Sequence, residues 1–110
     1  MRSRLTVLLF ALAAGCALPA LAGPPDPALQ RGQAIAHDTC ARCHGVATGE
    51  DSRNAGAPRF VVIAGRYNEI SLEDRLIEIA KQGHYEMPPQ PISREDIRSL
   101  TAYIESLAQP

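Results

Sequence analysis

The chain of 110 residues carries 11 Lys+Arg and 12 Asp+Glu, is 45% hydrophobic and has no Trp. This length allows one small domain, and a net charge of −1 argues against a protein that binds nucleic acid through a basic surface. Domains of this size bury too little apolar surface to be stable without help, so a disulfide, metal or cofactor is expected to complete the core.

The N-terminal segment has the pattern of a secretory signal peptide. Two arginines precede an apolar run at residues 5–12, and small residues follow up to Ala22. We predict a signal peptide at residues 1–22 and a domain at residues 23–110, which keeps nine Lys+Arg and all twelve Asp+Glu. No later segment approaches the ~20 apolar residues of a membrane span. The domain is therefore expected in the periplasm, an oxidising compartment.

Cys16 allows an alternative processing route. The string from Leu12 to Cys16 resembles a bacterial lipobox with an Ala at the third position before the cysteine. Processing there would leave a lipid anchor on Cys16 and a tether that ends near two prolines. We favour cleavage after Ala22, and lipoprotein processing remains the alternative.

The first expected helix begins near Asp26. Asp26 suits the N-cap and Pro27 suits the first helical position. A glycine inside a helix costs ~1 kcal/mol relative to alanine, so Gly32 indicates a close approach by another helix. One apolar face follows at helical spacing: Leu29, Gly32, Ile35 and Ala36.

The helix leads into a C-x-x-C-H string, with Cys40, Cys43 and His44 at the defining positions. This string is typical of c-type haem attachment. Each thiol can bond to one vinyl group, and two intervening residues let one turn of chain reach both. The next residue then lies under the ring, where its imidazole can bind the iron. The sequence therefore predicts one covalent haem c held by Cys40 and Cys43.

The competing interpretations of the two cysteines are a disulfide, half of a zinc site and a thioredoxin-like redox pair. A zinc site usually needs a second C-x-x-C or paired histidines, and only His37 and His84 remain. A thioredoxin-like site needs a βαβ context that the sequence does not suggest.

The segment after His44 is expected to form a loop and part of the haem pocket. Residues 48–57 are polar and contain glycines, which favours a loop. Phe60 and residues 61–63 are expected to line the pocket. A buried haem propionate needs hydrogen-bond donors. The candidate donors are Arg59, Arg66 and Tyr67. For each arginine, the alternative is plain exposure to solvent.

A second long helix is expected to start at Ser71, with Asp74 three residues later, and to end at Gly83. It is expected to back the haem with one apolar face: Leu72, Leu76, Ile79 and Ala80. A solvated face is expected from its charged residues: Glu73, Asp74, Arg75, Glu78 and Lys81.

Met87 is the candidate second axial ligand. Apart from the initiator it is the chain's sole methionine, and two prolines after it stiffen an extended loop. A His/Met pair raises the reduction potential and suits electron transfer. The alternatives are His84 as the ligand, an open sixth position, and a methionine that only fills the core.

The last expected helix begins at Ser93. Ser93 suits the N-cap and Asp96 the third helical position, while Ile92 and Ile97 suit a hydrophobic staple. One apolar face follows: Ile97, Leu100, Ile104 and Leu107.

Together, the C-x-x-C-H string, the methionine loop and the two terminal helices resemble the class I (mono-haem) cytochrome c family over residues 23–110. The resemblance implies an all-α fold of three to four helices wrapped around one haem, with the N- and C-terminal helices crossing. It implies that Gly32 packs against an aromatic of the last helix, at a place flanked by Leu100 and Tyr103. It also implies that the Pro58 carbonyl accepts a hydrogen bond from the imidazole N–H of His44. The absence of Trp departs from many members and leaves the propionate contacts open.

The resemblance implies a one-electron carrier and no enzyme activity. Iron held by His44 and Met87 would pass electrons between redox protein partners of a respiratory chain or a dehydrogenase, and we expect a monomer. Two alternatives are a dedicated electron-transfer subunit of one oxidoreductase complex and a haem-based ligand sensor with a labile sixth position.

Overall fold

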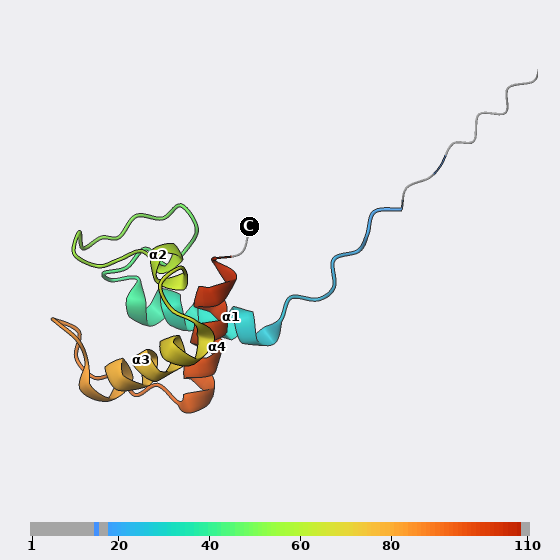
Figure 1. Cartoon of the computed structure of the whole chain (residues 1–110). Helices are drawn as coiled ribbons and strands as arrows, with labels where there is room; N and C mark the ends of the chain where they lie inside the picture. Colours follow the sequence, from blue (N-terminus) through green and yellow to red (C-terminus); the bar gives the residue numbers. More distant parts are fainter. Residues whose placement is uncertain (1–14, 16–17, 109–110) are drawn as a thin grey trace, which may run out of the picture.

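The computed structural model describes residue 15 and residues 18–108, and in that part every regular element is helical. The fold class predicted from the sequence, a small all-α domain, is confirmed. Figure 1 shows the elements in chain order: α1 (Pro27–Ile35), a single-turn π-helix (Ala36–Cys40), α2 (Phe60–Ala64), α3 (Glu69–Gln82) and α4 (Arg94–Ser106).

The first helix starts as its capping residues predict. The Asp26 carboxylate accepts a hydrogen bond from the Ala28 N–H at 2.9 Å, and Pro27 occupies the first position. The α-helical pattern ends at Ile35, where the chain widens into the π-helix that carries Cys40. Single π-turns inside helices occur frequently at functional sites. The sequence did not predict this turn.

The start of α3 predicted at Ser71 is wrong by two residues, because the cap is Asn68. The Asn68 side chain accepts from the Ser71 N–H at 3.0 Å, and Ser71 Oγ accepts from the Asn68 N–H at 3.2 Å. This reciprocal pair is a capping box, with Ser71 at its third helical position. The predicted end is confirmed, since Gly83 terminates α3 with φ of 70°.

Helix α4 starts at the predicted cap. Ser93 Oγ accepts from the Asp96 N–H at 3.1 Å. The Asp96 carboxylate does not complete a reciprocal box, because it pairs with Arg31 of α1 at 2.8 and 3.0 Å. Asp96 therefore ties the two terminal helices together.

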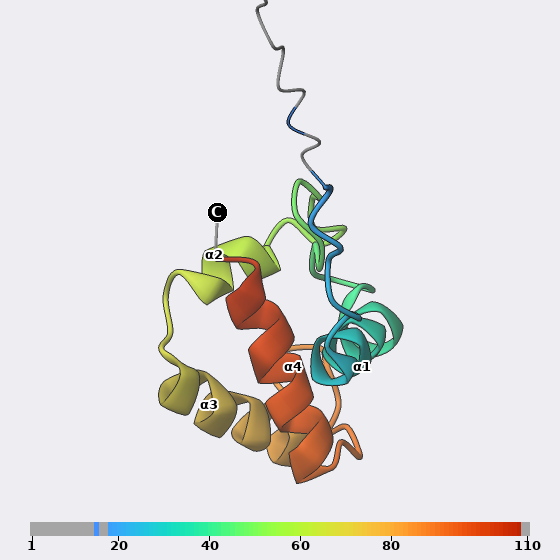
Figure 2. The same cartoon turned by 90° about the vertical axis from the view of Figure 1, so that its right-hand side faces the viewer.

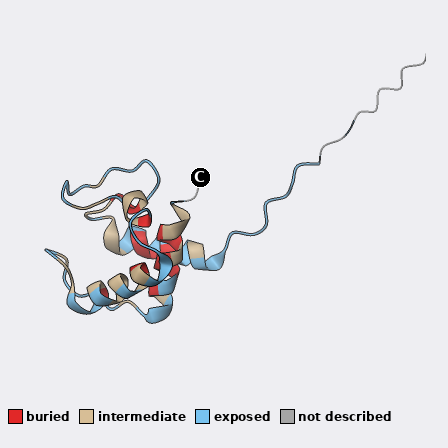
Figure 3. Ribbon diagram, viewed as in Figure 1, coloured by how far each residue is buried: buried red, intermediate tan, exposed pale blue. Residues whose placement is uncertain are grey.

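Helix α4 crosses α1 and also packs on α2 and α3, so it lies at the centre of the fold (Figure 2). The predicted close approach at Gly32 is confirmed: a Cβ there would collide with the Ser99 carbonyl and come within 2.7 Å of Tyr103 Cβ. Figure 3 shows the buried residues gathered around this crossing. The largest fully buried side chains are Leu72, Leu100 and Ile104.

Residues 18–26 run away from the helices in an extended, exposed path (Figure 1), with Leu18 88% and Leu21 96% accessible. Cys16 and most of the predicted signal peptide lie outside the described residues. In the described part, no helix is both long enough and apolar enough to cross a membrane.

Candidate functional site

A cavity of about 910 Å³ opens between the segment that holds the C-x-x-C-H string, α2, α3, α4 and the loop after α3. This volume is at the upper end of the range for small-molecule and cofactor sites. The string contributes all three of its chemical residues, Cys40, Cys43 and His44. Apolar side chains from three helices form much of the wall: Phe60, Ile63, Leu72, Leu76, Ile79, Ile97, Leu100 and Ile104.

The two thiols are carried by the π-helix and the turn after it. Cys40 closes the π-helix, and its carbonyl accepts from the N–H groups of Cys43 and His44 at 3.1 and 3.0 Å. Both thiols are half-buried and unbonded to each other. Burial raises the pKa of the Cys40 thiol to about 11, so this sulfur stays protonated at neutral pH and is a poor nucleophile for disulfide exchange.

His44 is oriented by two neighbours. Its Nδ1 lies 2.7 Å from the Pro58 carbonyl oxygen, which is the contact that the sequence resemblance implies. Phe60 packs beside the ring, with centroids 5.5 Å apart at 49°. The bond fixes Nδ1 as the donor, so Nε2 is left free to bind a metal, and such an outer hydrogen bond raises the basicity of the ligand.

A latch holds the chain immediately after His44. The Glu50 carboxylate accepts from the N–H groups of Val46 and Ala47 at 2.8 and 3.0 Å, and Tyr103 of α4 donates its hydroxyl to the Val46 carbonyl at 2.7 Å. These backbone hydrogen bonds lower the pKa of Glu50. Burial, with a smaller contribution from Glu50, raises the pKa of Tyr103. These hydrogen bonds attach the segment after His44 to α4.

A tight turn faces His44 across the cavity. His84 and Met87 exchange both backbone hydrogen bonds, at 3.0 and 2.8 Å, and both side chains line the cavity. Tyr85 at the tip has φ of 47°, a positive value that is unusual for a bulky residue. Its side chain is fully exposed. Gly83 has φ of 70°, and a Cβ there would collide with the Met87 carbonyl. The turn therefore presents both candidate distal ligands to the same space.

The His84 ring lies opposite His44, with centroids 6.1 Å apart. Its Nδ1 is buried and has no hydrogen-bond partner among the described residues. Burial lowers the pKa of His84, and the proximity of His44 and of the Arg75 guanidinium lowers it further. A buried polar atom without a partner is rare in native structures. His84 Nδ1 therefore suits a site that holds a further group.

The residues present fit a covalently bound haem. The cavity has two thiols, an oriented imidazole, an apolar wall and two candidate ligands on the opposite side. A zinc site is not completed here, since no three His, Cys, Asp or Glu side chains gather as metal ligands within the described ranges.

Comparison with known proteins agrees with this geometry. Residues 27–104 match the family model described as cytochrome c oxidase, cbb3-type, subunit III. Cytochrome c-552 of Bradyrhizobium diazoefficiens is 35% identical over 101 residues, which cover 92% of this chain and 88% of that protein. No solved structure matches significantly. The chain belongs to the cytochrome c family. It is a haem electron carrier that works with redox partners, and its cofactor is haem c on Cys40 and Cys43.

Of the three residues suggested for the haem propionates, two line the cavity of this cytochrome and one does not. Arg66 and Tyr67 are in the wall, with Tyr67 38% accessible. Arg59 lies outside the wall, where its guanidinium is 3.8 Å from the Asp51 carboxylate. The structure therefore does not bring Arg59 to the haem site.

Two other expectations about the wall need correction. The Arg75 side chain is 40% accessible, as expected for the solvated face of α3, but it also lines the cavity and donates to the Glu78 carboxylate. Its position between Leu72 and Leu76 on the helix could have revealed this. Val61 and Val62 do not line the cavity, because the short α2 helix turns only Phe60 and Ile63 towards it.

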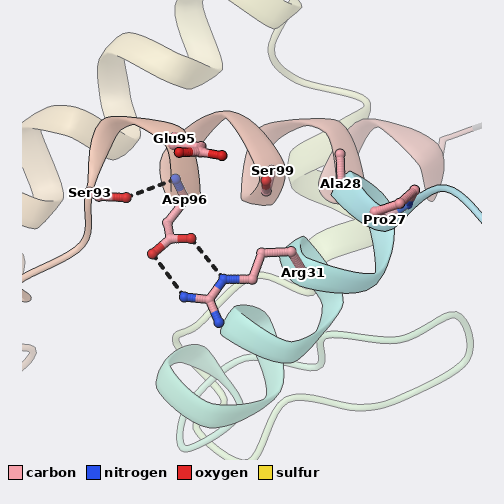
Figure 4. Close-up of a pocket in the computed structure, with 7 residues that line it drawn as sticks. All are labelled: Pro27, Ala28, Arg31, Ser93, Glu95, Asp96 and Ser99. Atoms are coloured by element: carbon pink, nitrogen blue, oxygen red, sulfur yellow. Dashed lines mark hydrogen bonds and ion pairs between the residues drawn. The ribbon is translucent and has the colours of Figure 1, made fainter.

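A second hollow of about 490 Å³ lies over the crossing of α1 and α4 (Figure 4). The Arg31–Asp96 pair occupies its wall, and the hydrogen bond to Arg31 lowers the pKa of Asp96. The thiols and imidazoles all line the other, larger cavity. We therefore interpret this hollow as part of the contact between α1 and α4 and not as a functional site.

Proposed function

We propose that this cytochrome is an exported one-electron carrier whose haem iron is held by His44 and Met87. The observation that carries the proposal is the arrangement across the cavity. His44 is aligned by Pro58 on one side, and Met87 lies in the wall on a turn that backbone hydrogen bonds define on the other. The haem supplies the one-electron chemistry, because its iron cycles between two oxidation states.

The protein residues keep the change between oxidation states small. The Pro58 carbonyl holds the His44 ring, and Pro88 with Pro89 stiffens the chain after Met87. With a protein ligand on each side of the iron, no position is left for a substrate, which supports an electron carrier over an enzyme. Our candidates to bind the propionates are the Arg66 and Arg75 guanidinium groups, which can neutralise them, and the Tyr67 hydroxyl, which can donate a hydrogen bond.

We further propose that the mature protein is residues 23–110, periplasmic and monomeric, and that it exchanges electrons between respiratory or dehydrogenase partners. The leader pattern at residues 1–22 supports export. A lipid on Cys16 is the alternative form of attachment. The net charge of the mature chain does not predict a strongly cationic docking ring, so contacts with partners are expected to be brief and largely apolar.

A dedicated subunit of an oxidoreductase complex is the second candidate function. One observation favours it: the matching family model is described as an oxidase subunit. Copurification with a membrane enzyme would support the subunit, whereas a free monomer in gel filtration would support the mobile carrier.

The spectrum of the purified protein tests the axial ligands. We expect a c-type pyridine haemochrome and, in the oxidised protein, the weak far-red sulfur-to-iron charge-transfer band. Met87→Ala should abolish that band and lower the reduction potential, because a thioether ligand raises it. A band that survives in the variant would show that Met87 is not the ligand. Rapid binding of carbon monoxide to the reduced wild type would instead indicate the sensor.

A further inference from the structure

His84 and Met87 occupy equivalent positions on their turn. They exchange both backbone hydrogen bonds as an antiparallel pair separated by two residues. Residues paired in this way project their side chains from the same face of the ribbon. Both side chains accordingly line the cavity. One turn therefore presents both side chains to the same space.

The separation of the two histidines suits a shared metal. An imidazole nitrogen binds a metal ion at about 2 Å, so two imidazoles on opposite sides of one ion have ring centres about 6 Å apart. The His44 and His84 centroids are 6.1 Å apart, and the planes differ by 24°. The buried Nδ1 of His84 has no partner in the described part of the chain. His37, by contrast, is exposed beside Asp38.

The ends of the turn are anchored while its tip is free. The Gly83 N–H donates to the Ile79 carbonyl at 2.8 Å, and the Gln90 N–H donates to the Ala80 carbonyl at 3.0 Å. Tyr85 and its neighbour Glu86 are exposed at the tip. Movement of the tip would therefore leave α3 and the rest of the fold in place.

We propose that His84 is a reserve axial ligand, which binds the haem iron whenever Met87 is lost or dissociates. The inference rests on the proposed function, since it needs a haem whose other ligand is His44. The two distal groups give the iron two closed states, one with sulfur and a higher potential and one with nitrogen and a lower potential. The sixth position is thereby kept from external ligands in both.

The test compares Met87→Ala with the double variant Met87→Ala/His84→Ala, both as holoproteins. The single variant should lose the far-red band yet remain low-spin, with the optical and electron paramagnetic resonance spectra of two nitrogen ligands in place of one nitrogen and one sulfur. The double variant should become high-spin. Reduced single variant should bind carbon monoxide at least about tenfold more slowly than the double variant, because only molecules in which His84 has dissociated can bind it.

Met87→Ala/His37→Ala is the matched control, since His37 is the remaining histidine of the chain and lies outside the cavity. It should stay low-spin. A high-spin Met87→Ala protein would overturn the reserve-ligand proposal while leaving Met87 as the normal ligand. A low-spin double variant, or loss of the low-spin state only with His37, would also overturn it. Circular dichroism of each holoprotein checks that helix content is unchanged.

Discussion

Helices α1 and α4 meet in direct backbone contact where they cross, whereas another face of α4 borders a large cavity. At the crossing, Gly32 lies against the Ser99 backbone with no space for a Cβ, and Arg31 and Asp96 form two hydrogen bonds. On the other side, Leu100 and Ile104 of the same helix line a cavity of about 910 Å³. Helix α4 thus takes part both in a close helix contact and in the wall of the haem cavity.

This difference explains how so short a chain without Trp forms a domain. The crossing brings the two ends of the domain together, and the haem supplies the apolar volume that the side chains around the cavity lack. Interiors are normally packed as densely as organic crystals. The folded state of this chain should therefore depend strongly on haem attachment on the cavity side and on close helix packing on the other.

The largest effect is expected from removing a thiol. Cys40→Ser or Cys43→Ser should reduce holoprotein to background in cells that carry a haem-ligation apparatus, because the cavity cannot be filled without the cofactor. The measurement is haem staining and a pyridine haemochrome of the periplasmic fraction. Arg42→Gln changes the exposed residue between the thiols and should preserve the yield. Abundant, folded haem-free protein from either serine variant would contradict the argument.

A smaller effect is expected at the crossing. Gly32→Ala should lower the free energy of unfolding of the holoprotein by about 1–3 kcal/mol, because a methyl group would be forced against the Ser99 carbonyl. Urea unfolding followed by circular dichroism measures it. The far-red band should persist in the folded variant, since the crossing does not touch the distal turn.

Gly65→Ala is the matched control for that change. At Gly65 the nearest atom to an added Cβ is the Val62 carbonyl oxygen at 3.7 Å, and φ is −81°. Alanine fits there and should be neutral or stabilise by about 0.4–1 kcal/mol through the unfolded chain. Equal losses at both positions would mean that close packing is not what distinguishes Gly32.

The contact between α1 and α4 was largely predictable from the sequence, because the signals that start these helices are local. Asp26 and Ser93 are caps that bond within three residues, and each begins the helix expected of it. The error at the start of α3 arose because Asn68 and Ser71 are both good capping residues. Only the folded geometry shows which of them lies outside the helix.

The cavity was predictable in its chemistry and less so in its shape. The C-x-x-C-H string identifies the thiols and the imidazole by spacing alone. Arg75 reaches the cavity because it lies between Leu72 and Leu76 on α3, although its charge alone favours the solvated face. The pairing of His84 with Met87 depends on a turn in which Tyr85 adopts φ of 47°, a conformation that its residue type disfavours. No pattern in the sequence indicates that geometry.

The smallest effect is expected at the latch that joins the two sides. Two backbone N–H groups lower the pKa of Glu50, so the folded state binds its proton less readily than the unfolded chain does. The stabilisation is therefore complete above the ordinary pKa of a glutamate and is lost as the pH falls through the lowered value. Glu50→Gln should keep an oxygen acceptor without the titration, and so flatten the acid side of the stability curve. Acid unfolding monitored by circular dichroism measures this, with Asp74→Asn on the exposed surface of α3 as the control. If both variants unfold along the wild-type curve, the titration of Glu50 contributes nothing to acid sensitivity.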